Sequence, residues 1–243
     1  LNFKIVADTN ALSVAVQNGD VNLVGIFTNV PNNQIEILQA DPNVTVQQSD
    51  PTKVYFMPIN TEVEGYSNPL VRQAISYAID YDYINQVAAN GLGSQPHCAM
   101  LGVNTFGYTE NGTNYTYDKE KALALLEEAG YPNGFECKIY VNGDVRTRSA
   151  QIIQAQLAEV GITVDISTYE WGALLDSLNA GEHEMFLLGW SNSSFDADGS
   201  TYQLFYSGNH GATGNRAFFS NNKVDELILS AQRESEESKR MEL

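Results

Sequence analysis

Residues 135–168 read FECKIYVNGDVRTRSAQIIQAQLAEVGITVDIST, and this stretch decides the fold. FECKIYVNG reads as a strand, and VRTRSAQIIQAQLAEVG as a helix that ends at Gly161. ITVDIST alternates as a second strand. The residues that follow repeat the order, with a helix in EWGALLDSLNAG that ends at Gly181 and a strand in EMFLLGW. Strands separated by helices of this length predict βαβ units with parallel pairing, so the expected fold class is α/β.

The segment after the third strand, GWSNSSFDADGS at residues 189–200, carries many hydrogen-bonding groups. Ligands of open α/β sheets bind beyond the carboxyl ends of the strands, where this segment, Asn142-Gly143 and Tyr169-Glu170-Trp171 are all expected. Trp171 and Trp190 should then lie on the same sheet edge, and an indole offers a solute a rigid surface and one N–H donor. The alternative is that both are core residues at helix–sheet contacts.

The charge balance excludes one class of partner. The chain has 30 acidic and 13 basic residues, a net charge of −17, and no basic stripe that could bind nucleic acid. No stretch approaches 18 uninterrupted apolar residues, so we expect no membrane span. The chain opens on the apolar run FKIV without an initiator Met and ends within a helical pattern, EESKRMEL. We therefore expect a fragment of a longer protein.

No catalytic constellation stands out. The sequence has no GxSxG elbow and no P-loop, and GLGSQP at Gly91 lacks the third glycine of a dinucleotide fingerprint and follows a helix. No cofactor is expected. A carboxylate pair such as Glu170 with Asp196 is an alternative acid–base reading, although turn chemistry explains Asp and Gly in this segment equally well. The three histidines are expected on the surface: His97, His183 and His210.

A metal site is not expected either. An EF-hand loop that begins at Asp196 needs Gly and Glu at its sixth and twelfth positions, but these hold Thr201 and Ser207. The two cysteines, Cys98 and Cys137, form no CxxC pair. Either they are disulfide-bonded, as an exported protein permits, or they are two buried thiols.

The first 60 residues predict short elements. DTNALSVAVQNG is expected to form a helix between the extended runs FKIV and DVNLVGIF, and a short helix should cover residues 33–39. VTVQQ and KVYFMPI are β-rich, and Pro58 places the second run at an edge or a crossover.

Two longer helices follow. SNPLVRQAISYAIDYDYINQVAANG predicts one amphipathic helix, with Ser67 or Asn68 as N-cap and Pro69 in its first turn. KEKALALLEEAG predicts the second, capped by Asp118 and ended by Gly130.

These motifs together resemble the family 5 solute-binding proteins of ABC transporters. NPLVRQAISYAIDYDYI at residues 68–84 is similar to a family pattern of VRQA followed by AID, with Tyr81 in place of the usual basic residue. YTYDKEKALALLEEAGYPNGF at 115–135 matches almost throughout. The Glu170-Trp171 and Gly189-Trp190 pairs and GNRAFFSNNKVDELILSA at 214–231 agree in order and spacing.

The resemblance implies a periplasmic-binding-protein-like type II lobe, a mixed sheet with flanking helices built from βαβ units. Residues 1–58 would belong to the first lobe and the crossover. Residues 59–243 would form the second, ligand-binding lobe, truncated before its final return segment. Such a receptor closes around its ligand by a hinge.

The resemblance also implies site residues at the end of the third strand and the start of the last helix of the βαβ series. Many peptide-binding members carry Asp three residues after the second tryptophan, where it pairs with the peptide's amino group; here that position holds Ser193. Either Asp196 takes over the role, or the ligand is not an ordinary peptide with a free amino terminus. The expected ligand-binding residues are Trp171, Trp190, Ser191, Asn192, Ser193, Ser194 and Asp196.

The function that the resemblance implies is an extracellular receptor of an ABC importer, not an enzyme, that delivers a peptide or related solute to permease subunits. We expect a monomer, anchored as a lipoprotein in the full-length protein, outside the cell or in the periplasm. The alternative is a sensing module that uses the same clamp without transport. A lipoprotein signal and adjacent permease genes would favour transport.

Overall fold

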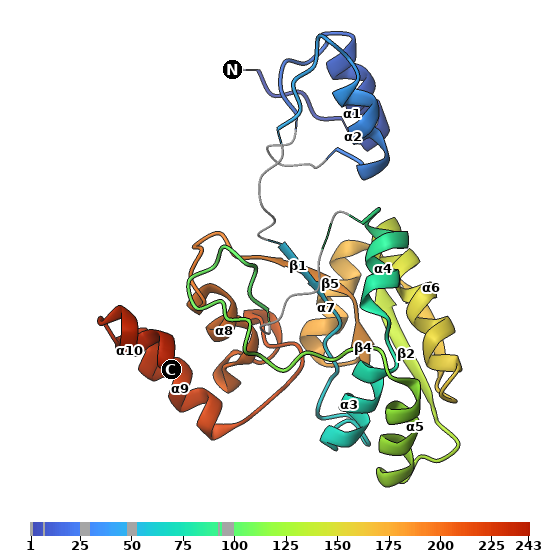
Figure 1. Cartoon of the computed structure of the whole chain (residues 1–243), viewed down its shortest axis with the longest axis vertical. Coiled ribbons are helices and arrows are strands. Elements are labelled where there is room, and N and C mark those ends of the chain that lie inside the picture. Colours follow the sequence, from blue (N-terminus) through green and yellow to red (C-terminus); the bar gives the residue numbers. More distant parts are fainter. Residues whose placement is uncertain (1, 7, 25–29, 48–52, 92, 94–99) are drawn as a thin grey trace.

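The computed structural model describes residues 2–6, 8–24, 30–47, 53–91, 93 and 100–243. Residues 2–47 include two helices, α1 (Thr9–Gln17) and α2 (Asn32–Gln39), which Figure 1 shows set apart from the rest of the chain. The Asp8 carboxylate caps α1 by accepting the N–H groups of Asn10 and Ala11. Both predicted helices are confirmed.

The predicted strand FKIV is wrong: residues 3–6 form no strand, and Ile5 is 97% exposed. An apolar run becomes a strand only where a second strand supplies hydrogen-bond partners. Residues 44–47 likewise form no strand. Of the predicted extended run DVNLVGIF, only residues 20–24 lie within the described residues, and they form no strand.

The described residues from 53 onward form the larger part of the chain, which we call the main body. A three-stranded parallel sheet forms its centre, as predicted. Its order is β3 (Thr163–Thr168), β2 (Glu136–Val141) and β4 (Met185–Phe186). The crossovers are α6 (Asp144–Ala158) and α7 (Trp171–Ala180), and α7 ends at Gly181 with φ +73°.

The predicted strand EMFLLGW serves two sheets instead of one. β4 pairs with β2, and β5 (Leu188–Ser191) pairs antiparallel with β1 (Lys53–Phe56). Leu187 lies between them and donates its N–H to the Tyr140 carbonyl at 3.1 Å. We expected one mixed sheet. The structure instead has two small sheets, one with the parallel pairings and one with the antiparallel pairing. β1 has β5 as its only strand partner among the described residues, in line with the expectation from Pro58.

The two sheets share one run of buried residues. Met185 and Leu187 pack in the main core with α3, α5 and α6, whereas Phe186 and Leu188 pack on the other side with α7. Since side chains alternate along a strand, a continuous apolar run fits a strand that is buried on both faces.

The predicted helix over residues 67–91 is two helices, α3 (Pro69–Tyr77) and α4 (Tyr81–Ala88). Asn68 caps α3, as one of the two predicted candidates. The break follows from Asp80, whose carboxylate caps α4 by accepting the Tyr83 N–H and whose own N–H donates to the Gln156 side chain. α5 (Lys119–Glu128) begins at its Asp118 cap as predicted.

The C-terminal part adds α8 (Asp198–Phe205), two short 3₁₀ turns (Ser207–Asn209 and Gly211–Thr213), α9 (Asn222–Arg233) and α10 (Glu237–Glu242). It is joined to the sheet region through His183, which is fully buried rather than on the surface as expected. Its Nε2 lies 2.7 Å from the Arg216 carbonyl oxygen. No helix of the described residues has the length and apolarity to cross a membrane.

The division of the chain into a first-lobe segment, residues 1–58, and a second lobe, residues 59–243, stays a prediction. Cys137 is a buried free thiol in β2, and Cys98 lies outside the described residues, as does His97.

Candidate functional site

The segment after β5 is organised by Asn192, whose side chain is buried. Its Nδ2 donates to the Asp196 carbonyl at 2.6 Å and to Ser200 Oγ at 3.1 Å. Its Oδ1 accepts the hydroxyl of Ser194 at 2.8 Å. Asn192 therefore holds the shape of the loop, while Ser193 and Ser194 stay exposed at its surface.

Trp190 lies on the packed face of the β1–β5 pair. It stands opposite Val54 and contacts the cluster that includes Met100 and Leu204. Its indole Nε1 donates to the Gly199 carbonyl at 3.1 Å. Its donor is thus satisfied within the protein, which favours the alternative of a core residue at a helix–sheet contact.

Asp196 forms a bidentate ion pair with Arg240 of α10. The two oxygen–nitrogen distances are both 2.6 Å, and Asp196 Oδ1 also accepts the Asp198 N–H at 2.9 Å. The Arg240 guanidinium lies 5.1 Å from the centroid of the Phe106 ring. Hydrogen bonding to Arg240 lowers the pKa of Asp196, so the carboxylate is charged and occupied by a protein cation.

Trp171 stands apart from this loop, at the first residue of α7 after β3, and 48% of its surface is exposed. The Arg146 guanidinium lies 5.6 Å from its ring centroid. Arg146 is held in turn by Asn142, whose Oδ1 accepts from Nη2 at 3.2 Å and whose Nδ2 donates to the Tyr169 carbonyl at 2.7 Å. The expected single edge for both tryptophans is wrong, because Trp190 belongs to the other sheet.

Sequence reasoning missed the open face of the β1–β5 pair. Lys53 stands opposite Ser191, and Tyr55 opposite Gly189. Lys53 Nζ lies 4.9 Å from the Tyr55 ring centroid, and Tyr55 is 54% exposed. Since side chains alternate along a strand, the pattern of KVYF could have placed Lys53 and Tyr55 on one face. No local signal could have said that Arg146 belongs beside them.

Arg146 lies against Trp171, and Tyr55 is near enough to perturb the Arg146 guanidinium electrostatically. Burial lowers the pKa of the Arg146 guanidinium, and the nearby Tyr55 phenol opposes that shift. We call Lys53, Tyr55, Arg146 and Trp171 the exposed wall. It combines two aromatic rings with two cations, an arrangement that can hold an organic solute by its flat faces and its charge.

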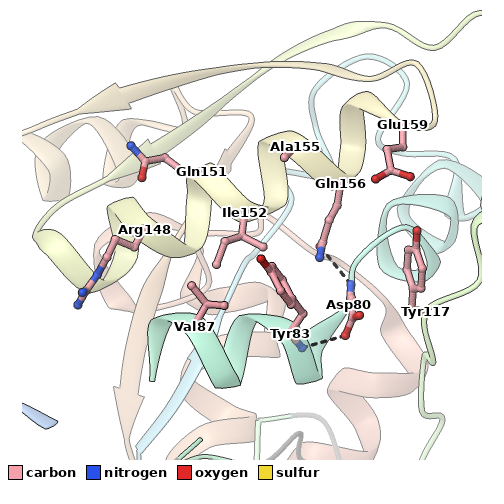
Figure 2. Close-up of a pocket in the computed structure, with 10 residues that line it drawn as sticks. All are labelled: Asp80, Tyr83, Val87, Tyr117, Arg148, Gln151, Ile152, Ala155, Gln156 and Glu159. Carbon is pink, nitrogen blue, oxygen red and sulfur yellow. Dashed lines mark hydrogen bonds between the residues drawn. The ribbon is translucent and has the colours of Figure 1, made fainter. Parts of the chain in front are cut away.

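A groove of about 660 Å³ lies elsewhere, between α4 and α6 (Figure 2). Asp80, Tyr83, Val87 and Arg148 are among its lining residues, and none of the predicted site residues lines it.

The described residues contain no group of three or more His, Cys, Asp or Glu side chains placed to hold a metal ion. His210 Nε2 lies 3.1 Å from the Phe219 carbonyl, so, like His183, it is engaged with the backbone. Neither histidine faces the exposed wall in any contact that the structure describes.

Comparison with known proteins gives consistent matches. A family model described as bacterial extracellular solute-binding proteins, family 5, middle region, matches residues 1–212. The heme-binding protein A of Haemophilus influenzae is 32% identical over 95% of this chain and 42% of its own length. The dipeptide-binding protein of Escherichia coli K12 is 30% identical over 85% of this chain and 39% of its own length.

A solved structure matches as closely. It is an ABC transporter-associated periplasmic binding protein from Helicobacter pylori in complex with the peptide STSA. It has a TM-score of 0.87 and 31% identity, and the match covers 98% of this chain and 46% of that protein. The chain therefore spans less than half the length of these relatives.

Proposed function

Because the chain belongs to the bacterial extracellular solute-binding proteins of family 5, we propose that it is the solute-binding part of a receptor that serves an ABC importer. The receptor binds a peptide or a related small solute and delivers it to permease subunits in the membrane. The relatives support this reading, since one is a dipeptide-binding protein and another is an ABC transporter-associated binding protein in complex with a peptide.

The observation that carries the proposal is the exposed wall. Tyr55 and Trp171 each leave about half of their surface open, and an exposed aromatic ring offers a solute a rigid apolar contact area. They lie at the carboxyl-end side of the parallel sheet, where open α/β sheets bind ligands. Because the chain spans less than half of its relatives, further solute contacts come from the remainder of the receptor.

Within this proposal the predicted loop residues divide by role. Ser191, Ser193 and Ser194 are exposed and available to a solute. Asn192 shapes the loop, and Trp190 supports it from the packed face. The solute role predicted for Asp196 stays a prediction, with the condition that a ligand ammonium would have to compete with Arg240 for the carboxylate.

Binding without chemical conversion is part of the same proposal, as are a monomeric state and a lipid anchor on the complete receptor. Membership of a family of solute-binding proteins supports the absence of chemical conversion.

Replacement of the Trp171 ring tests the proposal. Trp171→Ala removes one aromatic surface, so it should weaken solute binding about tenfold, the worth of one well-stacked aromatic contact. The measurement is calorimetry of the receptor with solutes that mass spectrometry identifies in the purified protein. Tyr83→Ala is the matched control, because Tyr83 is equally exposed, at 53%, but lines the groove between α4 and α6. Equal effects of the two changes, or none from Trp171→Ala, would contradict the proposal.

A further inference from the structure

The groove between α4 and α6 is walled by two helices that run in opposite directions. At the start of α4, the Asp80 N–H donates to the Gln156 side chain, which lies near the end of α6, at 3.1 Å. Figure 2 shows Val87, near the end of α4, on the same side of the groove as Arg148, near the start of α6. The groove, of about 660 Å³, is therefore a channel that follows two helix axes.

Apolar side chains line the middle of this channel. Tyr83 and Val87 are four residues apart on α4 and so share one face of that helix. Ile152 lies across from them on α6 (Figure 2). Tyr83 is 53% exposed and Val87 45% exposed, so part of this apolar surface is left in water. Exposed apolar side chains that gather in one patch mark an interaction site, whereas scattered single ones need no explanation.

The two ends of the groove carry opposite charges. Arg148 lines one end, and Asp80 and Glu159 line the other (Figure 2). Between positions 148 and 159, a rise of about 1.5 Å per residue separates the two ends by about 16 Å along the axis of α6. Glu159 is paired with Lys119 at 3.0 Å. Asp80 forms none of the ion pairs of the described residues, and its Oδ1 accepts the Tyr83 N–H at 2.9 Å. Asp80 is thus the carboxylate that can receive a cation at this end.

The shape of the groove favours a helix as its occupant over a small molecule. Small-molecule sites enclose most of the surface of their ligand. Here Tyr83, Val87 and Arg148 are all exposed, so a small molecule would stay largely in water. A third helix packs onto two neighbours at about 8–10 Å between axes, and about three of its turns would span the distance between the charged ends.

The charges also set the direction of such a helix. Helices favour acidic side chains in the first turn and basic ones in the last, because of the helix dipole. With its first turn at Arg148 and its last turn at Asp80, a helix of this kind meets an opposite charge at both ends. Its dipole opposes this direction by only about half a charge at each end, which is less than the unit charges of the side chains.

We propose that the groove between α4 and α6 is a docking site for an amphipathic helix of a partner protein. The partner helix is about three turns long, with acidic side chains at its start, apolar ones in its middle and basic ones at its end. It runs parallel to α6 and antiparallel to α4. This site goes beyond the proposed function, since none of the residues of the exposed wall lines the groove.

Two helical peptides of identical composition test the proposal on the 243-residue chain. The forward peptide is acetyl-Glu-Glu-Ala-Leu-Ala-Ala-Leu-Leu-Ala-Ala-Lys-Lys-amide, and the reversed peptide exchanges its glutamates and lysines. A side-chain staple on the face away from the leucines keeps both helical, because helices of this length are marginal in water. Binding is followed by the fluorescence anisotropy of a label on the peptide, up to about 1 mM chain. We expect the forward peptide to bind at least about tenfold more tightly than the reversed one.

Arg148→Glu locates the effect of charge. It should reduce the preference for the forward peptide to less than about threefold, because each peptide then meets one opposite and one like charge. Arg233→Glu is the matched control, since Arg233 is also an exposed arginine on a helix, α9, but does not line the groove. It should leave the preference unchanged.

Tyr83→Ala locates the apolar contact. It should weaken binding of the forward peptide about tenfold, because it removes the aromatic ring from the middle of the groove. Tyr55→Ala is the matched control: Tyr55 is 54% exposed but belongs to the exposed wall. Because Tyr83→Ala is expected to leave solute binding intact, a failure of the docking site and a failure of the proposed function are distinguishable.

Four outcomes would overturn the docking site. Equal binding of the two peptides, or tighter binding of the reversed one, would refute the arrangement of charges. Absence of binding by both would refute the groove as a site for this helix. An equal effect of Arg148→Glu and Arg233→Glu would attribute the preference to net charge. Equal effects of Tyr83→Ala and Tyr55→Ala would place the peptide elsewhere on the chain.

Discussion

His183 is a buried imidazole that cannot take a second proton without cost. A carbonyl oxygen only accepts, so Nε2 donates to the Arg216 carbonyl, and Nδ1 has no hydrogen-bond partner among the residues that the structure describes. The rings of Phe186 and Phe218 flank it, with centroids at 4.9 and 6.1 Å. Burial lowers the pKa of His183 from 6.5 to about 4. The neutral ring is thus one of the links between the sheet region and the C-terminal part.

This shift predicts a pH dependence of folding. The unfolded chain binds a proton at His183 below pH 6.5, whereas the folded protein does so only near pH 4. The free energy of unfolding should therefore fall between about pH 7 and pH 4, by about 3 kcal/mol in total, and His183 should contribute no further loss below that. Urea unfolding across this range measures it.

His183→Gln is the control, because it removes the titrating group and keeps a donor for the Arg216 carbonyl. Its stability should change less between pH 7 and pH 4 than that of the wild type. An unchanged slope would contradict the assignment to His183.

At the scale of elements, α10 is attached to the loop after β5 by the Asp196–Arg240 pair. The same guanidinium donates from Nε to the Ala231 carbonyl of α9 at 3.0 Å, so one side chain joins two helices to the loop. A partly exposed bidentate pair of this kind contributes modestly to stability.

A double-mutant cycle measures that contribution. Asp196→Asn and Arg240→Gln should each destabilise the chain, and together by less than the sum of the two, with a coupling of about 1 kcal/mol. Thermal or urea unfolding at low salt is the suitable measurement. Guanidinium chloride is avoided as a denaturant, because salt screens the ion pair. Additive effects would mean that the pair adds nothing to stability.

The elements show how far the sequence could lead. The parallel units were predictable because Gly161 and Gly181 punctuate a clear change between strand and helix periods. The division of residues 67–91 was not, because a helix that continues and one that restarts at Asp80 share the same apolar face, and the Gln156 partner comes from a distant helix.

The site was less predictable than the fold. The loop residues were found from their position after a strand, but Asn192 and Trp190 face inward once the strand register is known. Lys53 and Tyr55 come from β1 and Arg146 from α6, and no local sequence signal relates these two parts of the chain.

On the scale of the whole molecule, residues 2–47 contribute nothing to the main core. None of the described residues in this segment belongs to the three buried clusters, and their hydrogen bonds stay within the segment, such as Gln17 Nε2 to Asp41 at 3.3 Å. The clusters are instead built from β1 onward. The stability of the main body should therefore not depend on this segment.

Deletion of residues 1–47 tests this independence. We expect the shortened chain to unfold within about 2 °C of the full chain, because a loss of less than about 0.5 kcal/mol shifts the midpoint by no more than that in a chain of this size. Differential scanning calorimetry gives both midpoints. A drop of 5 °C or more would show that the segment supports the main body after all.

The one-residue spacing between β4 and β5 has a mechanical consequence. No loop lies between the two sheets to take up slack, since Leu187 alone connects them and is itself bonded to Tyr140 of the central strand. The two sheets are therefore linked in series by an inextensible connection. A shift of β5 relative to β1 would therefore pass along the backbone into β4 and the parallel sheet, with no flexible turn between them to absorb it.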